Sequence, residues 1–362
     1  MTVVGELTQE RAYYYCEDCH HGFFPRDEEL GLGDELFSPG IQRMVAFTAA
    51  SLSFQESETL LRELVGLPIE AKHIERTAES IGQDIAADER RNVVAQKPAR
   101  STMYMGMDGT GIPMRAAELV GRAGKQEDGS SKTREVKLVT VWTADGRDKD
   151  GIPVRDEGSV SYNAAIESAA TADTDEQVSE FALRVQREAD RRGFDSAKRR
   201  VIIGDGAKWI WNMAYELFPG AIQIVDLYHA KGTVSQAAKD IFGTESAVGV
   251  RKAKQWRDDV EAGAIDRILG DLELFRTSIP EAATCIKYLQ TNRHRMRYPD
   301  FHKQGLCTSS GVVEAGCKVS IGARLKCAGM HWSLKGANAI IALRCCRLSS
   351  RFDDYWSRRV PA

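Results

Sequence analysis

The chain has 362 residues, of which 43% are hydrophobic and 28% are charged. At roughly 100–200 residues per domain, this length predicts two or three domains and excludes a peptide hormone or a disordered tail. No run approaches the ~18 uncharged apolar residues of a membrane helix, and the first residues lack the basic start and apolar run of a signal peptide. We therefore expect a soluble cytoplasmic protein with no membrane partner.

Charge is distributed unevenly along the chain. The formal net charge is −3, but residues 1–100 hold 10 Lys and Arg against 18 Asp and Glu, whereas residues 301–362 hold 10 against 3. The basic end also contains Trp332, Tyr355 and Trp356. Basic and aromatic residues together are typical of a surface that binds phosphates and stacks bases. A solvated helix surface has the same composition, so composition alone does not separate the two.

The segment 11–25 alternates aromatic residues with the pair Cys16-x-x-Cys19, which is half of a zinc ribbon. A structural Zn²⁺ site needs four ligands, and only His20 and His21 are near enough in sequence to complete this one. Adjacent histidines beside the cysteine pair are poorly placed to close the same tetrahedron. We therefore favour the alternative, a short β-hairpin with two free thiols in a reducing compartment.

Residues 38–91 show the apolar spacing of helices. Ser53-Phe-Gln-Glu has the pattern of a capping box, and Gly66-Leu-Pro separates one helix from the next. Two helices across a short turn resemble a helix-turn-helix, although any helical hairpin has this pattern and the segment is acidic. A linker is expected at 96–99.

From residue 102 onward, the pattern alternates between strands and helices. Strands are predicted over 102–108, 134–142, 158–162, 200–205 and 221–229, and helices over 174–193 and 208–217. This order indicates an α/β sheet covered by helices. Residues 230–300 predict an all-helical insertion, and helices follow over 311–323 and 334–350.

Three carboxylates are candidates for chemistry. Asp108 and Asp205 each end a predicted strand and precede a glycine, where open α/β sheets place their ligands, although an Asp-Gly turn explains either one alone. Glu314 is the only acid between Phe301 and Phe352. Together the three supply the oxygen ligands of two Mg²⁺ (or Mn²⁺) ions, with Asp108 bridging both ions, Asp205 on one and Glu314 on the other. Such a pair of ions stabilises the attacking and leaving oxygens when a phosphodiester is cut.

Six motifs follow one another along the chain. They are Asp108-Gly-Thr-Gly-Ile-Pro-Met, Gly121-Arg-Ala-Gly-Lys-Gln-Glu-Asp-Gly, Lys132-Thr-Arg-Glu-Val-Lys-Leu, Gly204-Asp-Gly-Ala-Lys-Trp-Ile-Trp, Ile224-Val-Asp-Leu-Tyr-His-Ala and Arg324-Leu-Lys-Cys-Ala-Gly-Met-His-Trp-Ser. In this order they resemble the ISKra family of bacterial DDE-type insertion-sequence transposases, over nearly the whole chain from about Glu10 to Tyr355. The resemblance implies an RNase H-like catalytic domain that uses Asp108, Asp205 and Glu314 for magnesium-dependent strand cleavage and strand transfer at the ends of a mobile element.

The resemblance also implies a domain order. We expect a partial zinc ribbon or β-hairpin at 1–35, a helical, helix-turn-helix-like DNA-binding region at 36–98, and the first part of the catalytic core at 99–243. A helical insertion follows at 244–300, and the second part of the core, with basic C-terminal helices, at 301–362. The expected partners are terminal-repeat and target DNA. A homo-oligomer on DNA is also expected, because two element ends must be held together.

Asp226 and His229 resemble the Cys/Asp-x-x-His signature of Mutator-like transposases. We assign them a supporting role, because Gly204-Asp205-Gly matches the catalytic position of the family. The alternative for His229 is a residue at a helix start that is hydrogen-bonded to the acid three positions earlier.

Further along, Arg324 and Lys326 are predicted to contact DNA phosphates. Trp332 either stacks on a base at the cleavage site or packs in the core at a helix junction, and we slightly favour the core.

ISKra proteins typically carry an upstream Cys-x-x-Cys that completes the ribbon, and this sequence begins after that place. The expectation is therefore either a shortened copy or a misassigned start. Two alternatives to an active transposase stay open: a truncated or repurposed copy that acts only as a DNA-binding protein, and an RNase H-like nuclease that acts on RNA or hybrids.

Overall fold

The computed structural model describes residues 2–3, 10, 12–25, 37–93, 102–122, 124, 129, 131–149, 151–169, 179–309 and 311–359. The linker expected at 96–99 and residues 123 and 125–128 of the second motif lie outside the described residues. The chain forms two compact units. The first comprises Met1–Asn92, Gly111–Arg134 and Val319–Ala362, and the second comprises Val93–Thr110 and Glu135–Lys318. Among the described helices, none has the length and apolar character to cross a membrane.

The first unit is mainly helical. Its elements are the hairpin β1 (Tyr14–Cys16) and β2 (His21–Phe23), the helices α2 (Pro39–Ala49), α3 (Phe54–Val65), α4 (Ala71–Arg91), α13 (Ala323–Leu325), α14 (Leu334–Leu348) and α15 (Phe352–Arg359), and the 3₁₀ turn η1 (Ala116–Leu119). The predicted capping box is confirmed, since Ser53 Oγ accepts from the Glu56 amide (3.1 Å) and Glu56 Oε2 accepts from the Ser53 amide (2.9 Å).

Helices α4 and α14 pack side by side in this unit. Their backbones approach so closely at Gly82 that a β-carbon there would lie 2.1 Å from the carbonyl oxygen of Ala339. Only glycine fits such a contact. Helices α2, α3 and α4 confirm the helical region predicted over 38–91. The longest of them, α4, packs against a helix from the far end of the sequence.

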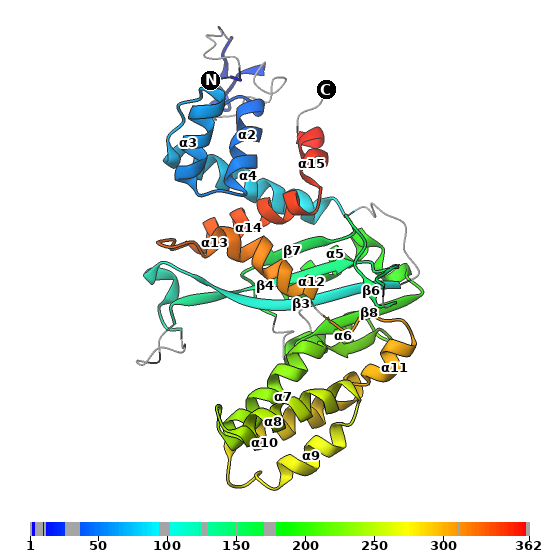
Figure 1. Ribbon diagram of the computed structural model, residues 1–362. Helices are drawn as coiled ribbons and strands as arrows, with labels where there is room; N and C mark the ends of the chain where they lie inside the picture. Colours follow the sequence, from blue (N-terminus) through cyan, green and yellow to red (C-terminus); the bar gives the residue numbers. More distant parts are fainter. Residues whose placement is uncertain are drawn as a thin grey trace. The chain divides into compact units, whose positions relative to one another are not determined.

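The second unit contains a five-stranded mixed sheet in the order β7-β4-β3-β8-β9, in a mixed α/β fold (Figure 1). The strands are β3 (Thr102–Pro113), β4 (Thr133–Trp142), β7 (Ser161–Ala165), β8 (Arg199–Gly204) and β9 (Ile222–Val225). Strands β3, β8 and β9 pair in parallel, and β4 and β7 pair antiparallel. The last residues of β3 and the first two of β4 belong to the first unit. A small hairpin joins β5 (Gly146–Arg147) and β6 (Pro153–Val154).

Helices cover and extend this sheet. They are α5 (Glu180–Arg192), α6 (Lys208–Leu217), α7 (Leu227–Phe242), α8 (Ala247–Glu261), α9 (Ile265–Glu273), α10 (Pro280–Asn292), α11 (Tyr298–Lys303) and α12 (Gly311–Gly316), with the short turns η2 (Phe194–Ser196) and η3 (Arg293–Arg295) and the π-helical turn η4 (Cys317–Gly322). Helices α7 to α10 pack on one another as the predicted helical segment (Figure 1).

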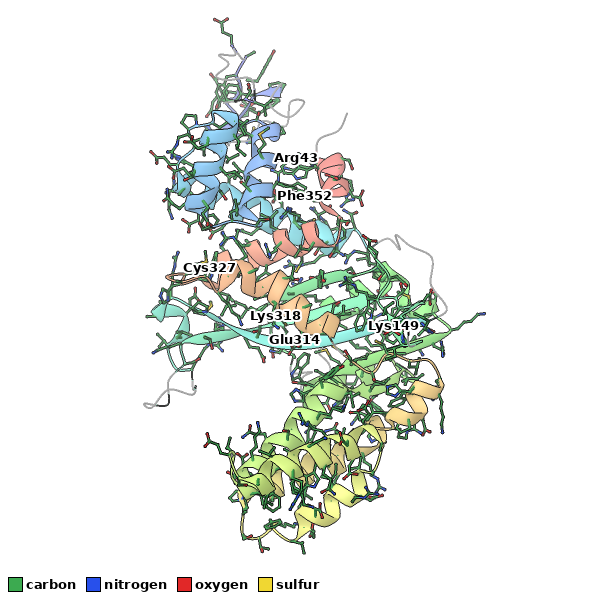
Figure 2. The ribbon with its side chains drawn as sticks, viewed as in Figure 1. Arg43, Lys149, Glu314, Lys318, Cys327 and Phe352 are labelled. Atoms are coloured by element: carbon green, nitrogen blue, oxygen red, sulfur yellow. The ribbon has the colours of Figure 1, made fainter. Side chains whose placement is uncertain are left out.

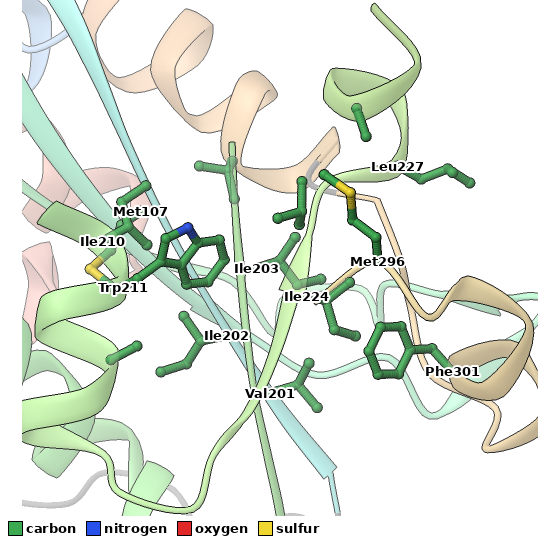
Figure 3. Close-up of a cluster of buried hydrophobic side chains, with 14 of the residues drawn as sticks. Met107, Val201, Ile202, Ile203, Ile210, Trp211, Ile224, Leu227, Met296 and Phe301 are labelled. Atoms are coloured by element: carbon green, nitrogen blue, oxygen red, sulfur yellow. The ribbon is translucent and has the colours of Figure 1, made fainter. Parts of the chain in front are cut away.

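The centre of the sheet is apolar on both faces. Val201, Ile202 and Ile203 are successive residues of β8 that point to alternating faces, and all three are fully buried (Figure 3). Ile224 of β9 and Trp211 of α6 belong to the same buried cluster. A continuous apolar run is the sequence signature of a strand covered on both sides, which is why β8 could be predicted nearly to the residue.

Two predicted strands differ from the structure. The strand predicted over 158–162 lies at Ser161–Ala165, because its pairing with Lys137–Val141 of β4 sets its register. The strand predicted over 221–229 ends at Val225, because Asp226 caps helix α7 and turns the chain into it. Helix α5 begins after its cap Ser179, and residues 174–178 of the helix predicted there lie outside the described part.

Candidate active site

Asp108 lies in the interior of β3, so the prediction that it ends a strand is wrong. The strand continues to Pro113, because residues beyond Asp108 keep an extended conformation as part of the sheet. The Asp108 carboxylate accepts hydrogen bonds from the Gly109 amide (2.7 Å) and from the Cys317 thiol (3.3 Å). Burial raises the pKa of Asp108 above its usual range, and the charge of Asp205 raises it further.

Asp205 directly follows β8, as predicted. In the parallel pairing Gly106 lies opposite Ile203, so the same register carried two residues further places Asp108 and Asp205 beside each other. The electrostatic influence of Asp205 on Asp108 agrees with this proximity. One Asp205 oxygen accepts from the Ala207 amide (2.8 Å) and fixes the turn into α6.

Asp226 directly follows β9. Gly204 of β8 lies opposite Val225 of β9, so the same register carried one residue further places Asp226 opposite Asp205. The Asp226 carboxylate accepts from the His229 amide (2.5 Å), which is the N-cap bond of α7. The alternative interpretation of His229, a helix-start residue bonded to the acid three positions earlier, is thus confirmed for its backbone. Its imidazole is exposed and lines the same cavity as Asp226.

Glu314 is on α12. This helix packs on the sheet through Val313, the residue before Glu314. The contact is close, since a β-carbon at Gly106 would lie 2.1 Å from Val313 Cγ2. The segment before α12 is also tied to strands, because the Cys307 amide donates to the Tyr104 hydroxyl (3.1 Å). These contacts bring the region around Glu314 to the strand that carries Asp108.

The Glu314 side chain is 68% exposed and pairs with Lys318 one turn later, at 2.7 Å (Figure 2). The hydrogen bond and the charge of Lys318 lower the pKa of Glu314. In this conformation the third carboxylate therefore faces a lysine.

One cavity of about 900 Å³ joins these residues. Its walls include the predicted catalytic residues Asp108, Asp205 and Glu314 and the predicted supporting residues Asp226 and His229. Positions separated by 97 and 109 residues in sequence thus meet at one place in the fold.

The donor set of this cavity suits a hard divalent cation, because neighbouring carboxylates repel each other until a cation offsets their charge. Asp108 and Asp205 fit this requirement. Among the described residues, however, no group of three or more His, Cys, Asp and Glu side chains is arranged to hold a metal ion. Glu314 has to leave Lys318 before it can act as the third ligand.

A sequence profile of the uncharacterised protein family UPF0236 matches residues 1–351. The chain belongs to the UPF0236 family. No curated protein matches the chain.

Among solved structures, this UPF0236 chain shows similarity to the Drosophila P element transposase strand transfer complex. The two are 8% identical, the match covers 92% of this chain and 83% of the other, and the TM-score is 0.29. A TM-score this low supports no argument about the fold or the activity of the UPF0236 chain.

Tyr288 is a site residue that the sequence did not reveal. Its hydroxyl, on α10, donates to the backbone carbonyl of Asp205 (3.2 Å), and its ring packs on Gly206. A β-carbon at Gly206 would lie 2.6 Å from the ring, and Gly206 has a φ of +107°. The helical segment therefore holds the turn that carries Asp205. The contact spans 83 residues, and no local pattern could have indicated it.

Cys317 was also missed. It is buried at the start of η4, three residues after Glu314, and its thiol donates to Asp108. No local pattern indicates this contact, because a free cysteine carries no sign of its partner.

The β-hairpin expected at the N-terminus is confirmed. Cys16 ends β1, Cys19 lies in the turn, and both thiols are free and exposed. Within the part of the chain that the structure describes, no third or fourth ligand joins them. Zinc binding by Cys16 and Cys19 stays a prediction.

Trp332 is 6% exposed, so the favoured interpretation, packing in the core, is confirmed. Its indole donates to the Leu325 carbonyl (3.0 Å), and its ring packs edge-on against Phe54. Trp332 also pairs by backbone hydrogen bonds with the end of β3, at Pro113 and Arg115.

Arg324 is 1% exposed and is therefore misassigned as a phosphate contact. Its guanidinium donates to the Ala49 carbonyl (2.8 Å), and Arg344 bonds the next carbonyl, that of Ala50. The helix dipole favours cations at the C-terminal end of α2. Part of the basic charge in residues 301–362 therefore stabilises the fold. Lys326 is exposed, and its predicted contact with DNA stays a prediction.

Proposed function

We propose that this protein is a DDE-type transposase of the ISKra kind, which binds the ends of its element, cuts the phosphodiester and joins the freed 3′-hydroxyl to target DNA. One observation carries the proposal: the strand register sets Asp108 beside Asp205, in a cavity that Glu314 also lines. The six ordered motifs of the sequence support the same interpretation. We infer that the mixed sheet with its helical segment before Glu314 is an RNase H-like core.

In this mechanism, Asp108, Asp205 and Glu314 would hold two Mg²⁺ ions. When bound, such ions stabilise the attacking and leaving oxygens of the phosphodiester. Asp108 is aligned by the Gly109 amide and the Cys317 thiol. Asp205 is aligned by the Ala207 amide, and the turn that carries it is held by Tyr288. The protein thus fixes two of the proposed ligands in advance, while Glu314 would have to leave Lys318 to become the third.

The first test is Mg²⁺ binding, measured by isothermal titration on the full chain. Asp205→Asn removes a proposed ligand, and Asp195→Asn is the matched control, because Asp195 pairs with Arg200 and does not line the cavity. We expect Asp205→Asn to lose binding and Asp195→Asn to keep it. Equal binding in both variants would contradict the assignment of Asp205.

The second test is cleavage of a labelled duplex that carries the element's terminal repeat. Wild type and Asp195→Asn should cut at the element boundary, and Asp205→Asn should not. Binding of the repeat without any cleavage in wild type would instead support a protein that only binds DNA. Cleavage of an RNA–DNA hybrid without preference for the repeat would support a nuclease.

A further inference from the structure

The cavity extends well beyond the three carboxylates, onto the helical segment. His229, Thr233, Gln236 and Asp240 recur along one face of α7 and line it. The adjacent helix α10 contributes Glu281, Thr284 and Tyr288. Apart from Tyr288, which holds the turn of Asp205, and the predicted supporting residue His229, the proposed chemistry at Asp108 and Asp205 does not use this second part of the cavity.

The charge of the lining restricts what can enter. Among the residues that line the cavity, all within the described part of the chain, there are six carboxylates and no lysine or arginine. The excess of carboxylates therefore repels phosphate groups wherever no cation offsets it. Lys318 pairs with Glu314, and the Lys231 ammonium lies 6.0 Å from the centroid of the Tyr228 ring. Whatever occupies the α7 and α10 part must be neutral or cationic.

The uncharged groups in this part match a flat, polar ligand. Tyr228 is 69% exposed on the cavity wall, which is a large aromatic surface to leave in water. The hydroxyls of Thr233 and Thr284 donate to the carbonyls of His229 and Pro280, so their oxygens can accept from a ligand. The Gln236 amide donates one N–H to Asp240 and keeps its oxygen and its other N–H for a ligand. An aromatic surface beside such groups is how proteins bind an unpaired nucleobase, by stacking on its face and bonding to its edge.

Space for such a ligand exists beside α7. Gly232 lines the cavity between Tyr228 and Gln236, and a β-carbon placed on it would meet no atom within 4 Å. The total volume, about 900 Å³, lies in the range of small-molecule sites.

We propose that the α7 and α10 part of the cavity binds an unpaired nucleobase of the DNA strand, next to the phosphodiester held at Asp108 and Asp205, with Tyr228 as the stacking surface. The inference rests on the proposed function, since that function places DNA at the carboxylates. Extruding a base costs stacking and pairing energy, and the contacts in this subsite would offset that cost. The position of the cut would then be set partly by which base leaves the duplex.

The test uses a short DNA duplex with one unpaired 2-aminopurine, compared with the fully paired duplex, in buffer containing Ca²⁺. Binding is followed by the fluorescence of the base. Gly232→Leu fills the open space with a residue that favours helix. Gly270→Leu is the matched control, because Gly270 also lies within a helix, also faces open space, and is outside the cavity.

We expect wild type and Gly270→Leu to prefer the unpaired probe and to quench its fluorescence. Gly232→Leu should weaken its binding roughly tenfold or more. Tyr228→Ala should have a similar effect, whereas Tyr215→Ala, which removes an exposed tyrosine outside the cavity, should not. Equal binding of the unpaired probe by Gly232→Leu and Gly270→Leu would overturn the inference.

Magnesium binding by the same variants separates this inference from the proposed function. Gly232→Leu should bind Mg²⁺ as wild type does, because it leaves the carboxylates in place. Normal Mg²⁺ binding and cleavage by wild type, without preference for the unpaired base, would refute the base subsite alone. Absence of Mg²⁺ binding in wild type would refute the proposed function.

Discussion

Replacing Gly206 by alanine should destabilise the protein more than the same change at Gly220. Both glycines have positive φ, +107° and +80°, where an L-residue costs roughly 1–2 kcal/mol. At Gly220 the nearest atom to an added β-carbon is 3.7 Å away, on the flexible side chain of Arg200. At Gly206 the added carbon would lie 2.6 Å from the ring of Tyr288, which is partly buried and donates a hydrogen bond to the Asp205 carbonyl.

The contact with the Tyr288 ring determines how much more Gly206→Ala should destabilise the protein than Gly220→Ala does. Overpacking of this kind costs typically about 1–3 kcal/mol. Added to the cost of positive φ, it should lower the free energy of unfolding of Gly206→Ala by about 2–5 kcal/mol. Gly220→Ala should lower it by about 1–2 kcal/mol, from the positive φ alone. In a unit of about 200 residues, each kcal/mol lowers the unfolding midpoint by roughly 2–4 °C. Gly206→Ala should also weaken Mg²⁺ binding, because Asp205 is its neighbour.

Thermal unfolding by calorimetry measures these effects. A Tyr288→Ala change in the Gly206→Ala background should recover part of the loss, since it removes the ring that the new methyl group meets. Equal midpoints for Gly206→Ala and Gly220→Ala would refute the idea that α10 clamps the Asp205 turn.

Three further predictions follow from the site and its surroundings. Burial and Asp205 raise the pKa of Asp108 in the folded state, so ionised Asp108 destabilises the fold at neutral pH. Asp108→Asn should therefore raise the metal-free unfolding midpoint near about pH 7, a gain that should vanish below about pH 4, where both states are protonated. Lys318→Ala should change stability by less than about 0.5 kcal/mol, because its pair with Glu314 is exposed. Lys318→Ala should also lower the Mn²⁺ concentration at which binding is half-saturated, because Glu314 no longer has to leave a lysine. An increase in that concentration would argue against Glu314 as a ligand. Trp332→Ala should cost about 3–5 kcal/mol in urea unfolding; unchanged stability with weaker DNA binding would instead restore its predicted stacking role.

Local patterns in the sequence determined the elements that depend on neighbouring residues. The capping box at Ser53, the apolar run of β8 and the helix Lys208–Leu217 all follow from spacing and propensity within one segment. The position of Asp205 after its strand was also predictable, because a glycine follows the end of a buried apolar run.

Tertiary structure decided what depends on partners far along the chain. Asp108 lies inside a strand because the strand, as part of the sheet, extends past it. Arg324 is buried because helix α2 offers its terminal carbonyls, and charge alone had suggested a surface. The clamp of Tyr288 on Asp205 joins residues 83 positions apart. Such contacts depend on how the packed elements meet, which propensity and periodicity within a segment do not encode.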